Sequence, residues 1–295
     1  MRQLLYLKLK KWFTLILFGV VLSGVLLVVR FPGQQIKHFV VQTLERHFPG
    51  TECVLEDIAY RFPLTITVGH IRFQQVGRGE TVFELENGVV KPAFFLPGRA
   101  FFFTAGLYGG KLGCRIRLDW EEERIYFDDL LIQRLNMARL EGLQNRLQRR
   151  FTGFFDFTGS CSAQISTRGF EEISGKITLN DGSLGLQQPL FLYTQLDLQR
   201  AQATIRLKKN RMLFSEGQFT GNQFKGKLGG TLQVVSPWTG STFEMTGLLQ
   251  PKATVLQRDG RTRTMVRRLK KQFGDGALPF VVQGTLGQPD LRFGR

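Results

Sequence analysis

The chain has 295 residues and three cysteines, Cys53, Cys114 and Cys161, a number too small and odd for a disulfide scaffold. No CxxC pair is present, which excludes a cysteine-based zinc or redox motif. The formal net charge of +16 indicates a preference for anionic partners, but the basic residues are spread along the polar sides of predicted strands, so no nucleic-acid partner is expected. We expect three buried thiols, and one disulfide remains the alternative.

The first feature in chain order is an uncharged hydrophobic stretch, residues 12–29, in which thirteen residues are Leu, Ile, Val or Phe. As a helix it would be about 27 Å long, close to the ~30 Å hydrocarbon core of a bilayer. We interpret it as an uncleaved transmembrane helix. A cleaved signal would need small residues where Val28, Val29 and Arg30 stand, and a buried core helix would keep a polar face.

The basic residues before this stretch, with no acid among them, predict a cytoplasmic N-terminus. The predicted organisation is therefore a cytoplasmic segment 1–11, a transmembrane helix 12–29, a linker with a short amphipathic helix 30–50, and a β-rich periplasmic domain 51–295. Within the linker, Ile36, Val40 and Leu44 recur at helical spacing over residues 34–48. Basic amphipathic helices are also predicted over 135–150 and 264–273. Capping an end of a sheet is their expected role, and lying on an anionic bilayer is the alternative.

From residue 53 onward the hydrophobic period changes from 3.6 to 2, which indicates strands. Over residues 111–120 every second residue is apolar, and the same alternation returns in 161–166, 203–208, 224–234 and 243–249, with glycine-rich turns between the runs. Strands that are apolar on one side predict an antiparallel sheet with one wet and one dry face. The chain is long enough for about 15 such strands.

The dry face has to be covered, by a second sheet as in a sandwich, by curling of the sheet on itself, or by lipid acyl chains. The 27 phenylalanines, often adjacent to one another, favour a thick core or an apolar groove. The fold class predicted is mainly β: a transmembrane helix, then an elongated, curved antiparallel sheet, as a half-open groove or a sandwich, with a few short amphipathic helices. The residues predicted to line the apolar groove are Leu112, Ile116, Leu118, Ile177, Ile205, Phe224, Leu228 and Leu232.

No constellation of residues indicates catalysis. Residues 221–227 match the first part of a phosphate-binding loop, but Leu228 stands where a magnesium-ligating Ser or Thr is needed, and the segment alternates as a strand does. Glu121, Glu122 and Glu123, like Asp128 and Asp129, are expected to be solvated turn residues. We predict a protein that is not an enzyme and has no cofactor, metal or catalytic residue.

Two segments resemble a known family. Residues 60–68, YRFPLTITV, and residues 278–290, LPFVVQGTLGQPD, together with an N-terminal anchor and glycine-punctuated strands, resemble the type II secretion system protein N family, which is similar to the AsmA-like periplasmic proteins. The resemblance implies a single-pass inner-membrane protein of a Gram-negative bacterium that works with other secretion proteins in protein export or assembly of the machinery. The AsmA-like proteins imply an alternative function, lipid binding or lipid transfer in outer-membrane biogenesis. In that alternative the apolar face carries acyl chains of phospholipid or lipopolysaccharide.

Overall fold

The computed structural model describes residues 12–19, 22, 32–47, 51–61, 64–75, 77, 81–93, 100–165, 170–191, 193–235, 240–258, 260–274 and 276–294. Of the predicted membrane span, residues 12–19 and Leu22 are helical, and the other residues of the span lie outside the described ones. Within the described ranges, no helix has both the length and the apolar character that crossing a bilayer requires. The transmembrane helix and the cytoplasmic N-terminus therefore stay predictions.

The described chain is mainly β. Its strands are β1 Thr51–Arg61, β2 Thr65–Gln75, β3 Thr81–Pro92, β4 Ala100–Leu107, β5 Gly110–Asp119, β6 Arg124–Asn136, β7 Phe151–Gln164, β8 Phe170–Leu190, β9 Tyr193–Lys208, β10 Arg211–Gly221, β11 Phe224–Gln233, β12 Thr242–Pro251, β13 Leu278–Thr285 and β14 Pro289–Phe293. The helices after the N-terminal stretch are α2 Gly33–His47, the 3-10 helix η1 Met137–Arg139, α3 Glu141–Leu147, α4 Ala253–Arg258 and α5 Gly260–Phe273.

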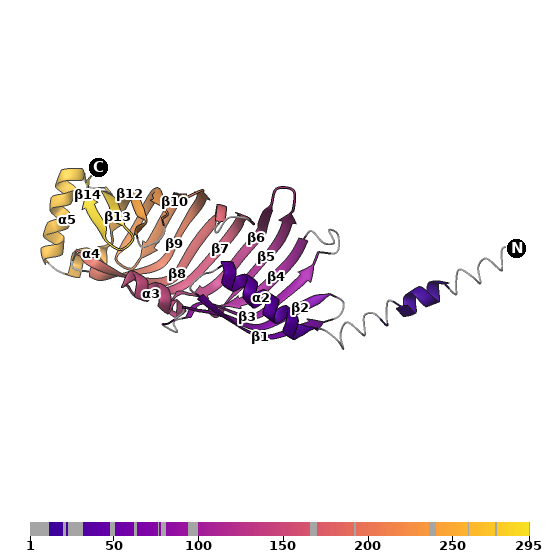
Figure 1. Ribbon diagram of the computed structural model, residues 1–295. Helices are drawn as coiled ribbons and strands as arrows, with labels where there is room; N and C mark the ends of the chain where they lie inside the picture. Colours follow the sequence, from indigo (N-terminus) through magenta and orange to yellow (C-terminus); the bar gives the residue numbers. More distant parts are fainter. Residues whose placement is uncertain are drawn as a thin grey trace.

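All strands belong to one 14-stranded sheet in which each strand pairs with the next one along the chain. Every pairing is antiparallel, so the predicted antiparallel sheet is confirmed. The sandwich alternative is wrong for the described part of the chain, because its strands form a single layer (Figure 1). Fourteen strands make thirteen spacings of about 4.8 Å, or roughly 60 Å from β1 to β14.

The register aligns the apolar sides of the strands into one continuous surface, here called the apolar face. Residues directly opposite each other in an antiparallel pair point to the same side. One row of such partners runs from β4 to β9 through Ala105, Leu112, Ile132, Phe157, Ile177 and Ala203. A second row runs from β4 to β12 through Phe101, Ile116, Phe127, Cys161, Ile173, Leu207, Met212, Leu232 and Phe243.

The sheet is interrupted by β-bulges, which increase the local twist and bend the strand. Shifts in register coincide with residues that have a positive φ inside strands: Asn87, Asp129, Arg134, Asp181 and Glu216. Three of these five are Asn or Asp, the residue types that best tolerate a left-handed backbone after glycine. The bulges are a physical source of the predicted curvature.

Two predictions in the middle of the chain are wrong. The helix predicted over 135–150 is reduced to η1 and α3, because β6 continues to Asn136 and Leu135 is buried opposite Phe155. The predicted turn at Asp128 and Asp129 is also part of β6, where Asp128 Oδ2 lies 3.3 Å from Arg117 Nε. The acidic residues 121–123, in contrast, do form an exposed turn between β5 and β6.

The helices near the two ends of the sheet agree with the sequence. The helix predicted over 34–48 is α2, which lies beside β1, where Glu45 Oε1 accepts a hydrogen bond of 3.2 Å from the backbone N–H of Cys53. The helix predicted over 264–273 forms the larger part of α5, which lies against the last strands (Figure 1). Val266 of α5 is fully buried, so this helix caps an end of the sheet, as expected.

Candidate functional site

An apolar hollow lies on the apolar face in the C-terminal half of the sheet. It has a volume of about 370 Å³ and is called the C-terminal cavity. Strands β8 to β14 contribute its apolar lining: Leu184, Leu186, Pro189, Leu190, Leu196, Leu198, Ala201, Phe219, Phe224, Leu228, Phe243, Leu249, Phe280, Val282, Pro289 and Leu291. Its polar lining residues are Arg149, Asp197 and Gln223.

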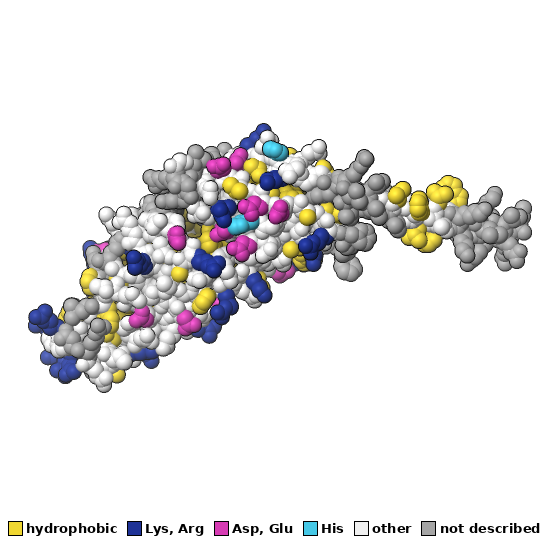
Figure 2. Space-filling view, turned by 90° about the horizontal axis from the view of Figure 1, so that it is seen from below, with side chains coloured by type: hydrophobic (Ala, Val, Ile, Leu, Met, Phe, Trp, Pro, Cys, Tyr) yellow, Lys and Arg dark blue, Asp and Glu magenta, His cyan; other side chains and the backbone are white. Residues whose placement is uncertain are grey.

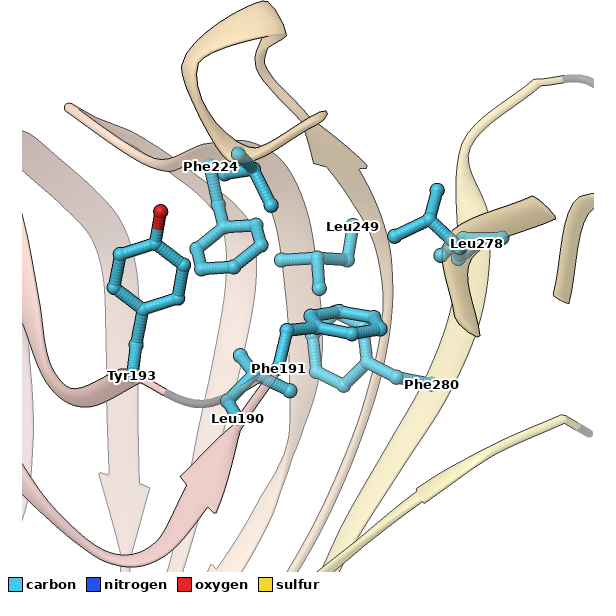
Figure 3. Packing of buried hydrophobic residues seen from close by; sticks show 9 residues of the cluster. Leu190, Phe191, Tyr193, Phe224, Leu249, Leu278 and Phe280 are labelled. Carbon is cyan, nitrogen blue, oxygen red and sulfur yellow. The ribbon is translucent and has the colours of Figure 1, made fainter. Parts of the chain in front are cut away.

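A cluster of buried residues with several aromatic rings lies beside the C-terminal cavity (Figure 3), and its Phe224 and Phe280 also line the cavity. The ring of Phe224 lies 5.8 Å from the ring of Phe191 and 5.8 Å from that of Tyr193. Phe191 in turn lies 5.2 Å from Phe293 of β14. Because Phe191 follows the end of β8, this contact joins the β8–β9 turn to the last strand. The C-terminal half of the sheet therefore curls on itself, one of the three ways in which the dry face could be covered.

Several of the many phenylalanines lie over glycines of neighbouring strands. A Cβ atom added to Gly247 would stand 2.7 Å from Cζ of Phe280, and one added to Gly175 would stand 2.7 Å from Cζ of Phe157. The rings thus lie directly against the backbone at positions where any other residue would push them away. This close approach explains the glycine-punctuated strands.

The helices α4 and α5 close the sheet beside the C-terminal cavity. Val255 of α4 and Val266 of α5 are both fully buried in the same cluster as Leu278 of β13. The hydroxyl of Thr262 donates a buried hydrogen bond of 3.3 Å to the carbonyl of Phe191. The helix is thereby fixed to the β8–β9 turn, so the aromatic side of the cavity has a rigid support.

The basic residues of α5 lie on its outer side. Figure 2 shows Lys and Arg side chains at the end of the molecule that α5 occupies. The helix contains no acidic residue, and its exposed basic residues are Arg261, Arg263, Arg267, Arg268 and Lys271. Its buried side faces the core while its basic side faces water, the arrangement of an amphipathic cap.

Two of the three polar residues that line the C-terminal cavity, Asp197 and Gln223, are hydrogen-bonded to each other. The carboxylate of Asp197 accepts hydrogen bonds from Gln223 Nε2 at 2.8 Å and from Gln195 Nε2 at 2.9 Å. The backbone N–H of Asp197 donates to Gln223 Oε1 at 3.2 Å. Asp197 is therefore satisfied by amide groups, and the described residues form no ion pair with it.

Arg149 is the third polar group, and its guanidinium has free donors. Its Nε and Nη2 atoms are buried and have no hydrogen-bond partner among the described residues. Burial lowers the pKa of Arg149 from its ordinary value, because the charged form loses hydration. Its backbone is fixed by the end of α3: Gln148 takes a left-handed conformation, and the N–H of Arg149 donates to the carbonyl of Gln144 at 3.2 Å.

The structure brings only some of the predicted groove residues together. Phe224 and Leu228 line the C-terminal cavity, and Ile205 is buried on the same apolar face. Leu112 packs against a separate cluster formed by Leu85, Ala105, Leu107, Tyr108 and Leu135. The remaining predicted residues, Ile116, Leu118, Ile177 and Leu232, are half-buried on the apolar face outside the cavity.

Sequence reasoning missed Arg149 and the residues of the curled end, such as Phe280 and Leu291. No local signal distinguishes Arg149 from the other arginines around it, because its role depends on strands that are distant in sequence. Phe280, in contrast, lies in an alternating segment at residues 278–285, and the period of that segment could have identified it as apolar lining.

All three thiols are free and buried, as expected. Burial raises the pKa of Cys114 to about 11 and that of Cys161 to about 12. These groups are structural, since a buried thiol with a raised pKa is a poor nucleophile. In the described part of the chain, no group of three or more His, Cys, Asp or Glu side chains is placed to hold a metal ion.

Comparisons of the chain with protein families, with characterised proteins and with solved structures find no match. The similarity to the type II secretion system protein N family thus rests on the residues quoted for it. The site has to be interpreted from its own geometry.

Proposed function

We propose that this chain is a periplasmic lipid-binding or lipid-transfer protein of the AsmA-like kind that holds an acyl chain in the C-terminal cavity. The observation that carries the proposal is an apolar cavity of about 370 Å³ that continues into an apolar face running across the sheet. Apolar cavities with a few polar groups are typical ligand sites. The lining consists almost wholly of aliphatic and aromatic side chains, which match a hydrocarbon and offer little to a polar substrate.

The size of the cavity favours one acyl chain. At ~30 Å³ for each water-sized group, 370 Å³ holds about twelve such groups, and a methylene is similar in size to a water molecule. Burial of about twelve methylenes at ~0.8 kcal/mol each contributes roughly 10 kcal/mol before the cost of association. Since association costs at least about 4 kcal/mol, we expect a Kd no tighter than tens of micromolar for the chain alone.

A scaffold role in type II secretion remains the other candidate, and it rests on the resemblance. Both functions need a domain anchored at the inner membrane, so location does not separate them. The cavity does separate them, because a scaffold has no need to hold lipid. Partner proteins of the secretion machinery, phospholipid and lipopolysaccharide remain the candidate partners.

The test measures how much lipid stays bound to the full chain. The chain is extracted from membranes into an amphipathic polymer, and its bound lipid is quantified by mass spectrometry. Ala201→Trp places an indole in the cavity without burying a charge, and Gln202→Trp, on the opposite face of β9, is the matched control. We expect near-stoichiometric lipid on the unmodified chain and on the control, and strong loss with Ala201→Trp. Absence of lipid from the unmodified chain, or equal lipid on both variants, would overturn the proposal.

A further inference from the structure

The geometry assigns to Arg149 the binding of an anionic head group, so that the C-terminal cavity selects an acyl chain that ends in a carboxylate or phosphate. This inference rests on the proposed function, because it concerns the same cavity. It adds the class of ligand: a charged amphiphile, and neither a neutral lipid nor a free anion. Three features of the site support it.

The first feature is the position of Arg149. It is half-buried, so its side chain adjoins both the apolar lining and the surface. Its main chain lies between α3 and β7, and the next residue is fixed to β8, because the carbonyl of Arg150 accepts a hydrogen bond of 2.9 Å from the N–H of Gly185. The guanidinium is thus attached to a backbone segment held from two sides, as a residue that orients a ligand requires.

The second feature is that Arg149 has hydrogen-bond donors without an acceptor among the described residues. Guanidinium nitrogens that are shielded from water normally have a hydrogen-bond acceptor, since a buried polar atom without a partner is costly. The only carboxylate in the cavity lining, Asp197, is held by Gln195 and Gln223. Arg149 keeps two buried N–H groups without an acceptor among the described residues. An anionic oxygen from a ligand would satisfy both, and the lowered pKa of Arg149 reflects the desolvation that such an oxygen would offset.

The third feature is the combination of this charge with the lining. Guanidinium groups bind carboxylate and phosphate oxygens through paired N–H donors. Apart from Asp197 and Gln223, the other residues that line the cavity are apolar and mostly Leu and Phe, which favour a hydrocarbon. A free phosphate would use only the arginine, and a neutral lipid would leave it unpaired. A ligand with both an acyl chain and an acidic head uses the whole site.

The experiment measures binding of radiolabelled dodecanoate and dodecanol to the full chain in amphipathic polymer, by equilibrium dialysis against a polymer-only blank. These probes have the same hydrocarbon chain and differ in the charge of the head. We expect the unmodified chain to bind dodecanoate about ten- to one-hundred-fold more tightly than dodecanol, the range expected for a hydrogen-bonded charge. Arg149→Gln should lose this preference and keep dodecanol binding, whereas Arg150→Gln, at the exposed neighbouring residue, should change neither.

The outcomes separate the two proposals. If neither probe binds the unmodified chain, the acyl-chain function fails and the head-group inference fails with it. If both probes bind equally, or if Arg149→Gln keeps the preference, the acyl-chain function stands and the inference about Arg149 is wrong. Displacement of dodecanoate by excess inorganic phosphate would indicate a free-anion site and also overturn it. Thermal unfolding of both variants checks their folding, and Arg149→Lys, which keeps the charge, should restore part of the preference.

Discussion

Phe224→Ala tests whether the aromatic side of the C-terminal cavity is as tightly packed as the structure indicates. Phe224 is 3% exposed, and its ring contacts those of Phe191 and Tyr193 at a centroid distance of 5.8 Å each. Removal of a buried Phe side chain costs about 3–5 kcal/mol, and lost aromatic pairs place this residue toward the upper part of that range. We therefore expect a loss of about 4–5 kcal/mol, a large share of the 5–15 kcal/mol typical of a folded domain.

The assay is urea unfolding of the full chain, with Phe102→Ala as the matched control. Phe102 is on β4, is 48% exposed and points to the face opposite the cavity, so its removal should cost less than about 1 kcal/mol. At a slope of about 3 kcal/mol/M, the midpoint for Phe224→Ala should fall by roughly 1.5 M. If the two variants unfold at the same urea concentration, the ring cluster does not stabilise the curled end, and the argument for a rigid cavity fails.

Three further predictions concern other parts of the sheet. Gly175→Ala should destabilise the chain by about 1–3 kcal/mol in urea unfolding, since the new methyl group would stand 2.6 Å from the carbonyl oxygen of Thr158 and 2.7 Å from Cζ of Phe157; an unchanged midpoint would contradict the close packing at this glycine. Cys114 and Cys161 should resist a thiol reagent at pH 8 until the chain is unfolded. The pKa values of the two thiols in the folded chain, about 11 and 12, are above the ordinary 9.0. Their contribution to the free energy of unfolding is therefore complete below pH 9 and is lost as pH rises toward 12. Replacing both by Ala should reduce this loss of stability at high pH, as measured by unfolding curves at each pH. Leu135→Glu should cost several kcal/mol because the site is 7% exposed in β6, whereas a tolerated change would favour the surface helix that the sequence suggests.

Much of the sheet could be predicted because its physical cause is local. Alternation over residues 111–120 reports which side of β5 is dry, and the register then places Leu112 opposite Ile132 and Ile116 opposite Phe127. Strands that follow one another closely in sequence usually pair as antiparallel neighbours, so the order of the strands in the sheet follows their order in the chain. What the alternation could not report is how far the apolar face is covered, since covering depends on contacts between distant segments.

The errors in β6 have a definite origin. Bulges at Asp129 and Arg134 each add a residue, so the apolar positions after Phe127 are separated by three, two and three residues instead of two. The strand alternation is therefore lost before Leu135, and Leu135 with Leu140, Leu143 and Leu147 fits the pattern of an amphipathic helix instead. Bulges have a weak sequence signal, because Asp or Asn inside a strand is equally compatible with a turn. Arg149 was missed for a different reason: only the curled strands bring an apolar lining to it.

The arrangement of helices indicates why a ligand, and not protein, would fill the C-terminal cavity. Met137 of η1 and the neighbouring Leu140 pack against the cluster that contains Leu107. Val255 and Val266 belong to the other cluster, at the C-terminal end. Between these covered ends the apolar face continues, with half-buried residues such as Ile177. A long apolar surface in water is unfavourable, and soluble proteins rarely keep one without a use. The C-terminal cavity, about 370 Å³, is space on this face that the described side chains leave unfilled. Closed ends, an apolar cavity and the buried donors of Arg149, which have no partner among the described residues, suit an acidic lipid whose chain can lie along the strands.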